Sequence, residues 1–125
     1  MNDIKNKEDI ELLINKFYGK VILDDLIGQI FTQVIKFSWD KHIPIMISFW
    51  NTLLFGVGDY KGNPMLKHID LNKIFPLNAD HFERWISLWE QTINENFFGT
   101  IANEAIIKAK NIASLMQYKI AKSIF

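Results

Sequence analysis

Cysteine is absent from this 125-residue chain, and so is any excess of charge of one sign. Without thiols there is no disulfide framework, no thiolate metal ligand and no covalent attachment of a cofactor through cysteine. Basic residues (Lys plus Arg) and acidic residues (Asp plus Glu) number 14 each and are scattered along the chain. We therefore expect no nucleic-acid partner and no anionic membrane surface as a target.

Long hydrophobic runs are also missing. The longest stretch without a charge, Ile43–Gly58, is shorter than the roughly 20 residues that a membrane span requires, and it is interrupted by Pro44 and by polar residues such as Ser48. It predicts a buried central helix and no membrane span. The N-terminal segment is mixed in charge and lacks an apolar stretch, so it does not read as a secretory signal, and we expect a cytoplasmic protein.

Apolar and aromatic side chains are abundant. Hydrophobic residues make up 49% of the chain and aromatic residues 14%. A chain of this length suits a single domain over residues 1–125, which buries about two-thirds of its unfolded surface. The aromatic share is larger than an ordinary helical core of this size requires, which indicates that some of these rings pack against a further partner.

The spacing of the apolar residues predicts an all-α protein. Apolar side chains recur every three or four residues, the period of a helix with one buried face. No internal repeat, low-complexity tract or convincing pair of strands breaks this pattern. The predicted helical segments are Ile10–Val21, Leu26–Phe37, Trp39–Phe55, Met65–Leu71, the stretch that follows Asn78 and carries Phe82 to Ile93, and Ile101–Ile120.

Local signals place several helix ends. Asp24 and Asp25 interrupt the first helical pattern. Pro44 has no amide hydrogen and is tolerated best in a first turn, which places His42 near the beginning of its helix. The segment from residue 56 to residue 64 holds three of the six glycines and predicts a loop.

Two further helices have recognisable starts. Asn63 and Pro64 suit an N-cap and a first helical residue, so a short helix follows them. Asn78 suits the N-cap of the next helix, where Leu77 and Phe82 are spaced to form a hydrophobic staple. The sequence thus predicts where both helices begin.

Two histidines occupy separate helical segments, and aromatic residues accompany them. His42 and His68 are joined by the glycine-rich loop. Two imidazoles in an aromatic pocket suggest a planar cofactor, and a neutral imidazole nitrogen is a good ligand for iron. Taken singly, each histidine is explained as a surface residue or a hydrogen-bonded core residue, and each aromatic residue as interior packing. His81, beside Asp80 early in a helix, keeps that explanation. The aromatic residues are Phe17, Tyr18, Phe31, Phe49, Trp50 and Trp85.

A series of short motifs resembles the group III truncated hemoglobins. The motifs occur in the family's order and at compatible separations over roughly residues 9 to 95, and the segment from the glycine-rich loop to His68 is the most specific part. The Gly-Gly motifs of the other truncated groups are missing, in agreement with group III. The motifs are Phe17-Tyr18, Ile30-Phe31, Trp39-Asp-Lys-His42, Phe49-Trp50, the run GDYKGNPMLKHIDL from residue 58 to Leu71, and His81-Phe82-Glu-Arg-Trp85.

This resemblance implies a two-over-two helical sandwich around noncovalently held haem b. His68 would be the proximal iron ligand and Phe31 would pack against the porphyrin. Tyr18, His42 and Trp85 match the distal polar positions, which makes them the candidate catalytic residues. The candidate cofactor-binding residues are Phe31, His42, Met46, Phe49, Trp50, His68, Leu71 and Trp85.

The resemblance also suggests a function. Negative charge develops on dioxygen at ferrous haem, and fixed donors stabilise that charge. Trp85 only donates, whereas Tyr18 donates and accepts. We therefore expect a haem protein with five-coordinate iron that binds dioxygen, nitric oxide or another diatomic ligand. Nitric oxide dioxygenation or peroxide turnover, supported by a reductase, is the leading hypothesis.

Three alternatives stay open at this stage. The first alternative is a noncatalytic oxygen store, oxygen carrier or ligand sensor. The second is a six-coordinate electron carrier that uses His42 or Met46 opposite His68. The third is a haem-free helical interaction module, because aromatic residues can simply form a core. Contacts to the haem propionates are left unassigned among Lys67, Arg84 and Tyr60, because nearness in sequence does not determine direction.

Overall fold

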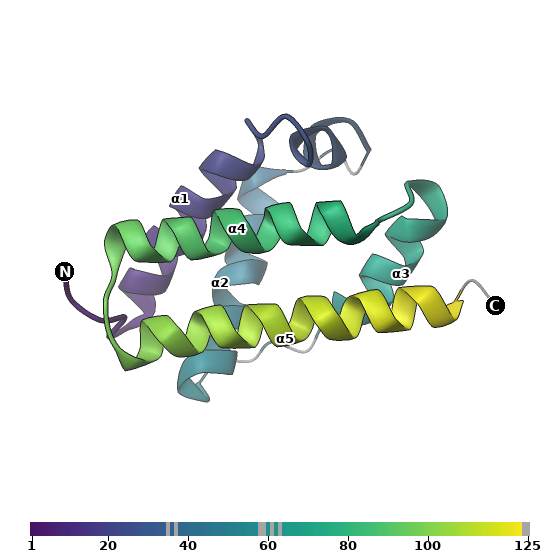
Figure 1. The fold of residues 1–125 in the computed structure, drawn as a ribbon. Coiled ribbons are helices and arrows are strands. Elements are labelled where there is room, and N and C mark those ends of the chain that lie inside the picture. Colours follow the sequence, from purple (N-terminus) through teal and green to yellow (C-terminus); the bar gives the residue numbers. More distant parts are fainter. Residues whose placement is uncertain (35, 37, 58–59, 61, 63, 124–125) are drawn as a thin grey trace.

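The computed structural model describes residues 1–34, 36, 38–57, 60, 62 and 64–123. Its secondary structure over these residues is entirely helical (Figure 1). None of the described helices is both long enough and apolar enough to cross a membrane. The elements are α1 (Lys7–Val21), the π-helical turn η1 (Ile30–Val34), α2 (Trp39–Phe55), α3 (Pro64–Ile74), α4 (Ala79–Asn96) and α5 (Thr100–Ser123).

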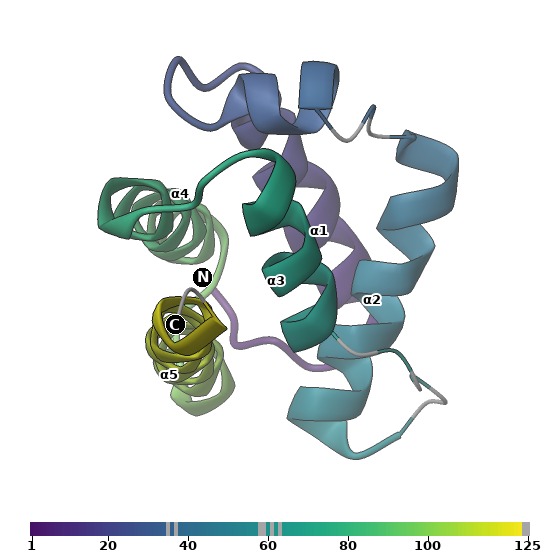
Figure 2. The same cartoon turned by 90° about the vertical axis from the view of Figure 1, so that its right-hand side faces the viewer.

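The long helices form two packed pairs. α1 packs against α2, and α4 packs against α5, while α1 also packs against α4 and so joins the pairs. Figure 1 shows α4 and α5 side by side, and Figure 2 shows them together on the opposite side of the molecule from α2. α3 packs mainly against α5. The result is the two-over-two helical sandwich that the resemblance implies.

A polar side chain caps the start of the first helix, and a turn follows its end. Asn6 is its N-cap and accepts a hydrogen bond from the backbone N–H of Asp9 at 2.9 Å. After Val21 the chain turns at Asp24, as predicted. The segment predicted as a second helix over Leu26–Phe37 forms a shorter, π-helical turn in its described part, and Phe37 lies outside the described residues.

The predicted bounds of the second long helix, Trp39–Phe55, are confirmed. Pro44 lies early in α2, where its missing amide hydrogen costs little, and His42 lies in the first turn. The helix ends at Gly56, whose φ of 68° is in the left-handed region that favours glycine. The N–H of Gly56 donates to the carbonyl of Thr52 at 2.9 Å and closes the last turn.

The starts of the later helices also agree with the sequence. α3 begins at Pro64 and continues to Ile74, three residues beyond the predicted end, whereas the predicted N-cap Asn63 lies outside the described residues. Asn78 caps α4 in a capping box, in which the side chain of His81 accepts from the Asn78 backbone N–H at 3.0 Å. His81 therefore has the structural role expected of it.

The main core, a cluster of buried residues that includes Phe17, Trp50, Trp89 and Ala105, joins the two helix pairs. Trp89 is fully buried, stacks on Trp50 with ring centroids 4.5 Å apart, and lies edge-on to Phe17. Its indole N–H donates to the carbonyl of Ala105 at 3.1 Å. Ala102, Ala105 and Ala109 are small and buried, so α5 approaches α4 closely.

Candidate haem site

His68 lies on α3 and shares a helix face with two apolar residues. Leu71 follows it by three residues on α3, and Phe75, the first residue after α3, follows it by seven, which is the spacing of side chains on one face of a helix. The N–H of Phe75 donates to the carbonyl of Leu71 at 2.8 Å and continues the last turn. Both are partly buried and pack against the main core. The half-buried His68 is therefore presented toward the same side of α3, which faces the interior of the protein.

Tyr18 lies near the end of α1, and only 7% of its surface is exposed. Its ring is edge-on to Phe17 at 5.0 Å and to Phe31 of η1 at 5.8 Å. Burial raises the pKa of the Tyr18 hydroxyl above its ordinary value of 10.0, because the phenolate would lose solvation. The hydroxyl thus keeps its proton at neutral pH and remains a hydrogen-bond donor.

Trp85 reaches the same aromatic group from α4. Its half-buried ring lies edge-on to Phe17, with centroids 5.9 Å apart, and parallel to Trp89 at 6.4 Å. Phe17 therefore contacts both Tyr18 and Trp85. The tertiary structure joins Tyr18, Phe31 and Trp85 in one connected aromatic cluster, although they come from three separate elements.

His42 is held at the start of α2 by the N-cap residue. Its Nδ1 lies 3.1 Å from the carbonyl oxygen of Ser38 and 3.3 Å from the Ser38 backbone nitrogen. One neutral tautomer donates to the carbonyl, and the other accepts from the N–H. Either contact ties the ring to the helix terminus. Met46, one turn further along α2, is partly buried against the main core.

Phe49 and Trp50 play different parts in the packing of α2. Phe49 is partly buried and lies edge-on to Trp50 at 5.4 Å and to Tyr60 at 5.1 Å. Trp50 is only 3% exposed and stacks on Trp89 inside the main core. Phe49 is thus the more accessible of these two predicted cofactor-binding residues, and the buried Trp50 contacts it edge-on.

The residues present fit a haem group. Partly buried apolar side chains from η1, α2, α3 and α4 pack on the main core and retain exposed surface, which a flat apolar group can cover. A porphyrin already supplies four ligands to its iron, so one imidazole such as that of His68 suffices. Within the described part of the chain, no group of three or more His, Asp or Glu residues could hold a bare metal ion. The partly buried side chains are Phe31, Met46, Phe49, Leu71 and Trp85.

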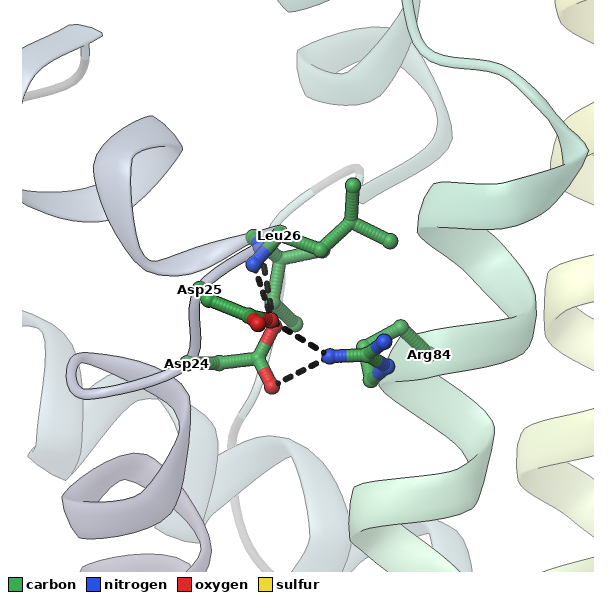
Figure 3. Close-up of polar contacts among 5 residues, drawn as sticks. Asp24, Asp25, Leu26 and Arg84 are labelled. Carbon is green, nitrogen blue, oxygen red and sulfur yellow. Dashed lines mark hydrogen bonds and ion pairs between the residues drawn. The ribbon is translucent and has the colours of Figure 1, made fainter.

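The three candidates for propionate contacts have different surroundings. The guanidinium of Arg84 donates to Asp24 Oδ1 at 2.8 Å and to Asp25 Oδ1 at 2.9 Å (Figure 3). Tyr60 lies against Phe49, and burial raises the pKa of its hydroxyl. Lys67 is exposed on α3. Arg84 is therefore already engaged by two carboxylates.

Asp24 is not among the site residues that the sequence predicts, yet in the structure its carboxylate contacts both α4 and its own turn. Burial alone would raise the pKa of this carboxyl. The N–H groups of Ile27 and Leu26 and the Arg84 guanidinium outweigh that effect, so the pKa lies below its ordinary value of 3.8. The only local signal is an acidic pair directly after a helix, which does not identify Arg84 as the partner.

Comparisons with known proteins identify relatives of this chain and a solved structure with a similar fold. No family model matches the chain. It is 36% identical over 120 residues to the group 3 truncated hemoglobin ctb of Campylobacter jejuni subsp. jejuni serotype O:2, covering 94% of this chain and 92% of that protein. The crystal structure of the group III truncated hemoglobin from Campylobacter jejuni superposes with a TM-score of 0.86 at 35% identity, covering 96% of this chain and 95% of that one.

The chain belongs to the group III truncated hemoglobins. The resemblance and the all-helical fold predicted from the sequence are thereby confirmed. Membership in a globin family supports haem binding and the binding of small diatomic ligands as general properties of this truncated hemoglobin. The roles of its individual site residues remain predictions.

Proposed function

We propose that this truncated hemoglobin holds haem b noncovalently through His68 and binds dioxygen or nitric oxide beside Tyr18 and Trp85 for redox chemistry. The observation that carries the proposal is the aromatic cluster in which Phe17 contacts both Tyr18 and Trp85. Bound haem supplies an iron centre that exchanges electrons with small ligands. A reductase would return the electrons consumed in nitric oxide dioxygenation or peroxide turnover.

The proposed haem contacts follow from burial. His68 supplies a neutral imidazole nitrogen from the side of α3 on which Leu71, and Phe75 just after the helix, pack on the main core. Phe31, Met46 and Phe49 offer apolar surface, and Trp85 closes the cluster from α4. Trp50 is buried in the main core and contacts Phe49 edge-on, so it is proposed to hold the Phe49 ring in place.

Tyr18 and Trp85 are proposed as the donors to a polar ligand. The raised pKa of the Tyr18 hydroxyl keeps its proton in place, and the indole N–H of Trp85 can only donate. Each hydrogen bond to a charged ligand contributes about 1.5–3 kcal/mol. His42, tied to Ser38 at its Nδ1, is assigned a part in shaping the pocket.

The test of the iron ligand is the absorption spectrum of protein expressed with a haem precursor. Wild-type protein should show a Soret band and a five-coordinate ferrous spectrum, and His68→Ala should lose or strongly weaken that band. His81→Gln is the matched control, because glutamine at this position preserves the capping box. Colourless wild-type protein, or a six-coordinate ferrous spectrum, would contradict the proposal and favour a haem-free module or an electron carrier.

The test of the donors is the rate of oxygen dissociation. Trp85→Phe and Tyr18→Phe should each release oxygen about tenfold faster or more, because each loses one hydrogen bond to the ligand. Tyr118→Phe, at an exposed position on α5, should leave the rate unchanged. Unchanged rates in both pocket variants would remove the proposed donors. Rapid reaction of the oxygenated protein with nitric oxide, sustained by a reductase, distinguishes an enzyme from an oxygen store or sensor.

A further inference from the structure

An ion pair joins the turn after α1 to the early part of α4. Arg84 Nη1 donates to Asp24 Oδ1 at 2.8 Å and to Asp25 Oδ1 at 2.9 Å. The side chain of Asp24 is 9% exposed, whereas that of Asp25 is 92% exposed. Solvent therefore screens the Asp25 contact much more than the Asp24 contact. Asp24 is the partner that holds Arg84 in place.

The same carboxylate also shapes the turn that leads to η1. Asp24 Oδ2 accepts hydrogen bonds from the backbone N–H groups of Leu26 and Ile27, both at 3.0 Å, as Figure 3 shows for the labelled Leu26. A Cβ added at the buried Gly28 would lie 2.9 Å from the carbonyl oxygen of Ile22, so the chain is tightly folded here. Both oxygens of Asp24 are thus used, one toward α4 and one toward its own turn.

This arrangement ties together the three elements that carry the aromatic cluster. Asp24 follows α1, which carries Tyr18, and its turn leads directly into η1, which carries Phe31. Arg84 is the residue before Trp85 on α4. A shift of the guanidinium relative to the carboxylate would therefore move Trp85 relative to both other rings.

We propose that Asp24 and Arg84 form a positioning clamp that sets the placement of Trp85 relative to Tyr18 and thereby tunes how firmly the pocket holds its ligand. Neither residue is assigned a contact with the ligand. Asp25 contributes little to the clamp. The inference rests on the proposed function, because the donors that the clamp places are Tyr18 and Trp85.

The test compares Arg84→Gln with wild type in the haem-loaded protein. Two readouts report the pocket: the infrared stretching frequency of bound carbon monoxide, which responds to the field of nearby donors, and the rate of oxygen dissociation. We expect a shifted stretch and about three- to tenfold faster dissociation, with partial restoration in Arg84→Lys. Asp24→Asn keeps an oxygen for the two turn amides but removes the charge, and it should behave like Arg84→Gln.

Two matched controls separate the clamp from general effects on stability. Asp25→Asn removes the exposed carboxylate from the same guanidinium. Lys20→Gln breaks a different ion pair between α1 and α4, the one with Glu95 near the other end of α4. Both variants should leave the stretching frequency and the dissociation rate within about a factor of two of wild type.

A double-mutant cycle identifies the route of the effect. In a Trp85→Phe background, Arg84→Gln should add no more than about a twofold change, because the donor that it places is gone. The clamp proposal is contradicted if Trp85→Phe and Tyr18→Phe change the rate of oxygen dissociation but Arg84→Gln changes only the unfolding midpoint. When those two donor variants leave dissociation unchanged, the proposed function fails and the clamp fails with it.

Discussion

The region around Trp89 and the region around His68 are built differently. Trp89 is completely buried, stacks on Trp50 and satisfies its indole N–H through Ala105. Around His68, the apolar side chains of Leu71 and Phe75 are only partly covered by protein. The first region is completed by its own side chains, whereas the second keeps apolar surface that haem would cover. We therefore expect the stability of the second region to depend on a ligand far more than that of the first.

The largest expected effect is on the self-contained region. Trp89→Ala should lower the free energy of unfolding by about 3–5 kcal/mol, because it leaves a cavity in the main core. The loss should be similar with and without haem, as measured by urea denaturation. Leu115→Ala, at an exposed position on α5, serves as the control. A decrease in the free energy of unfolding of less than about 1 kcal/mol would show that the main core does not stabilise this region.

Haem should stabilise mainly the region around His68. In haem-free protein, backbone amides of α3 and η1 should exchange with solvent faster than those in the middle of α4 and α5, because their apolar faces are incompletely covered. A ligand at about 100 times its Kd adds about 2.7 kcal/mol of stability, so haem should slow α3 exchange by up to about a hundredfold. Hydrogen exchange followed by mass spectrometry measures this. Equal protection of all helices without haem would contradict the comparison.

A smaller effect is expected at a cap that connects distant parts of the self-contained region. The carboxylate of Asp3 accepts from the N–H groups of Ile101 at 2.9 Å and of Ala102 and Ile4, both at 2.8 Å, so it caps α5. Asp3→Ala should cost about 1 kcal/mol at neutral pH. Denaturation of both proteins measures it, and Asp70→Ala, in an exposed pair, is the control.

The pH dependence of this cap follows from the pKa of Asp3. Burial acts to raise that pKa, but hydrogen bonds from Ile101, Ala102, Ile4 and Thr100 outweigh it and hold the pKa below 3.8. A lowered folded-state pKa contributes stability above the unfolded value and loses it as the pH falls through the folded value. The difference between wild type and Asp3→Ala should therefore shrink only below pH 3.8. A difference that is constant across that range would exclude the ionised cap.

The smallest effect is expected at the surface of α3. Asp70 Oδ1 and Lys73 Nζ are 3.8 Å apart, and both side chains are well exposed. Lys73→Ala should change the free energy of unfolding by no more than about 0.5 kcal/mol, because solvent and salt screen such a pair. A larger loss, measured by the same denaturation, would mean that α3 is stabilised by its charges and not by its apolar face.

Much of the helical framework was predictable from short-range patterns. The bounds of α2 follow from its apolar residues, and the position of Pro44 places His42 in the first turn. The start of α4 follows from Asn78. The stretch before α2 was less predictable, because the turn at Asp24 and the crowded Gly28 belong to local geometry that apolar spacing does not encode.

The candidate site was predictable as a set of residue types but not as a set of partners. The motif that contains His68 predicts an iron ligand, and the resemblance supplies roles for Tyr18 and Trp85. Nothing in the sequence pairs Arg84 with Asp24, which lies 60 residues away, or separates the buried Trp50 from the more accessible Phe49. Those distinctions depend on how the helices cross.

The sequence by itself determined where helices begin and end and which residue types each helix carries, since caps, prolines and apolar periodicity act within a few residues. Only the tertiary structure decided which side chains meet. It joined Asp24 to Arg84 and Asp3 to the start of α5, and it brought Tyr18 and Trp85 together around Phe17. The reason is physical: these contacts depend on the relative placement of whole helices, which is set by the packing of many apolar side chains at once.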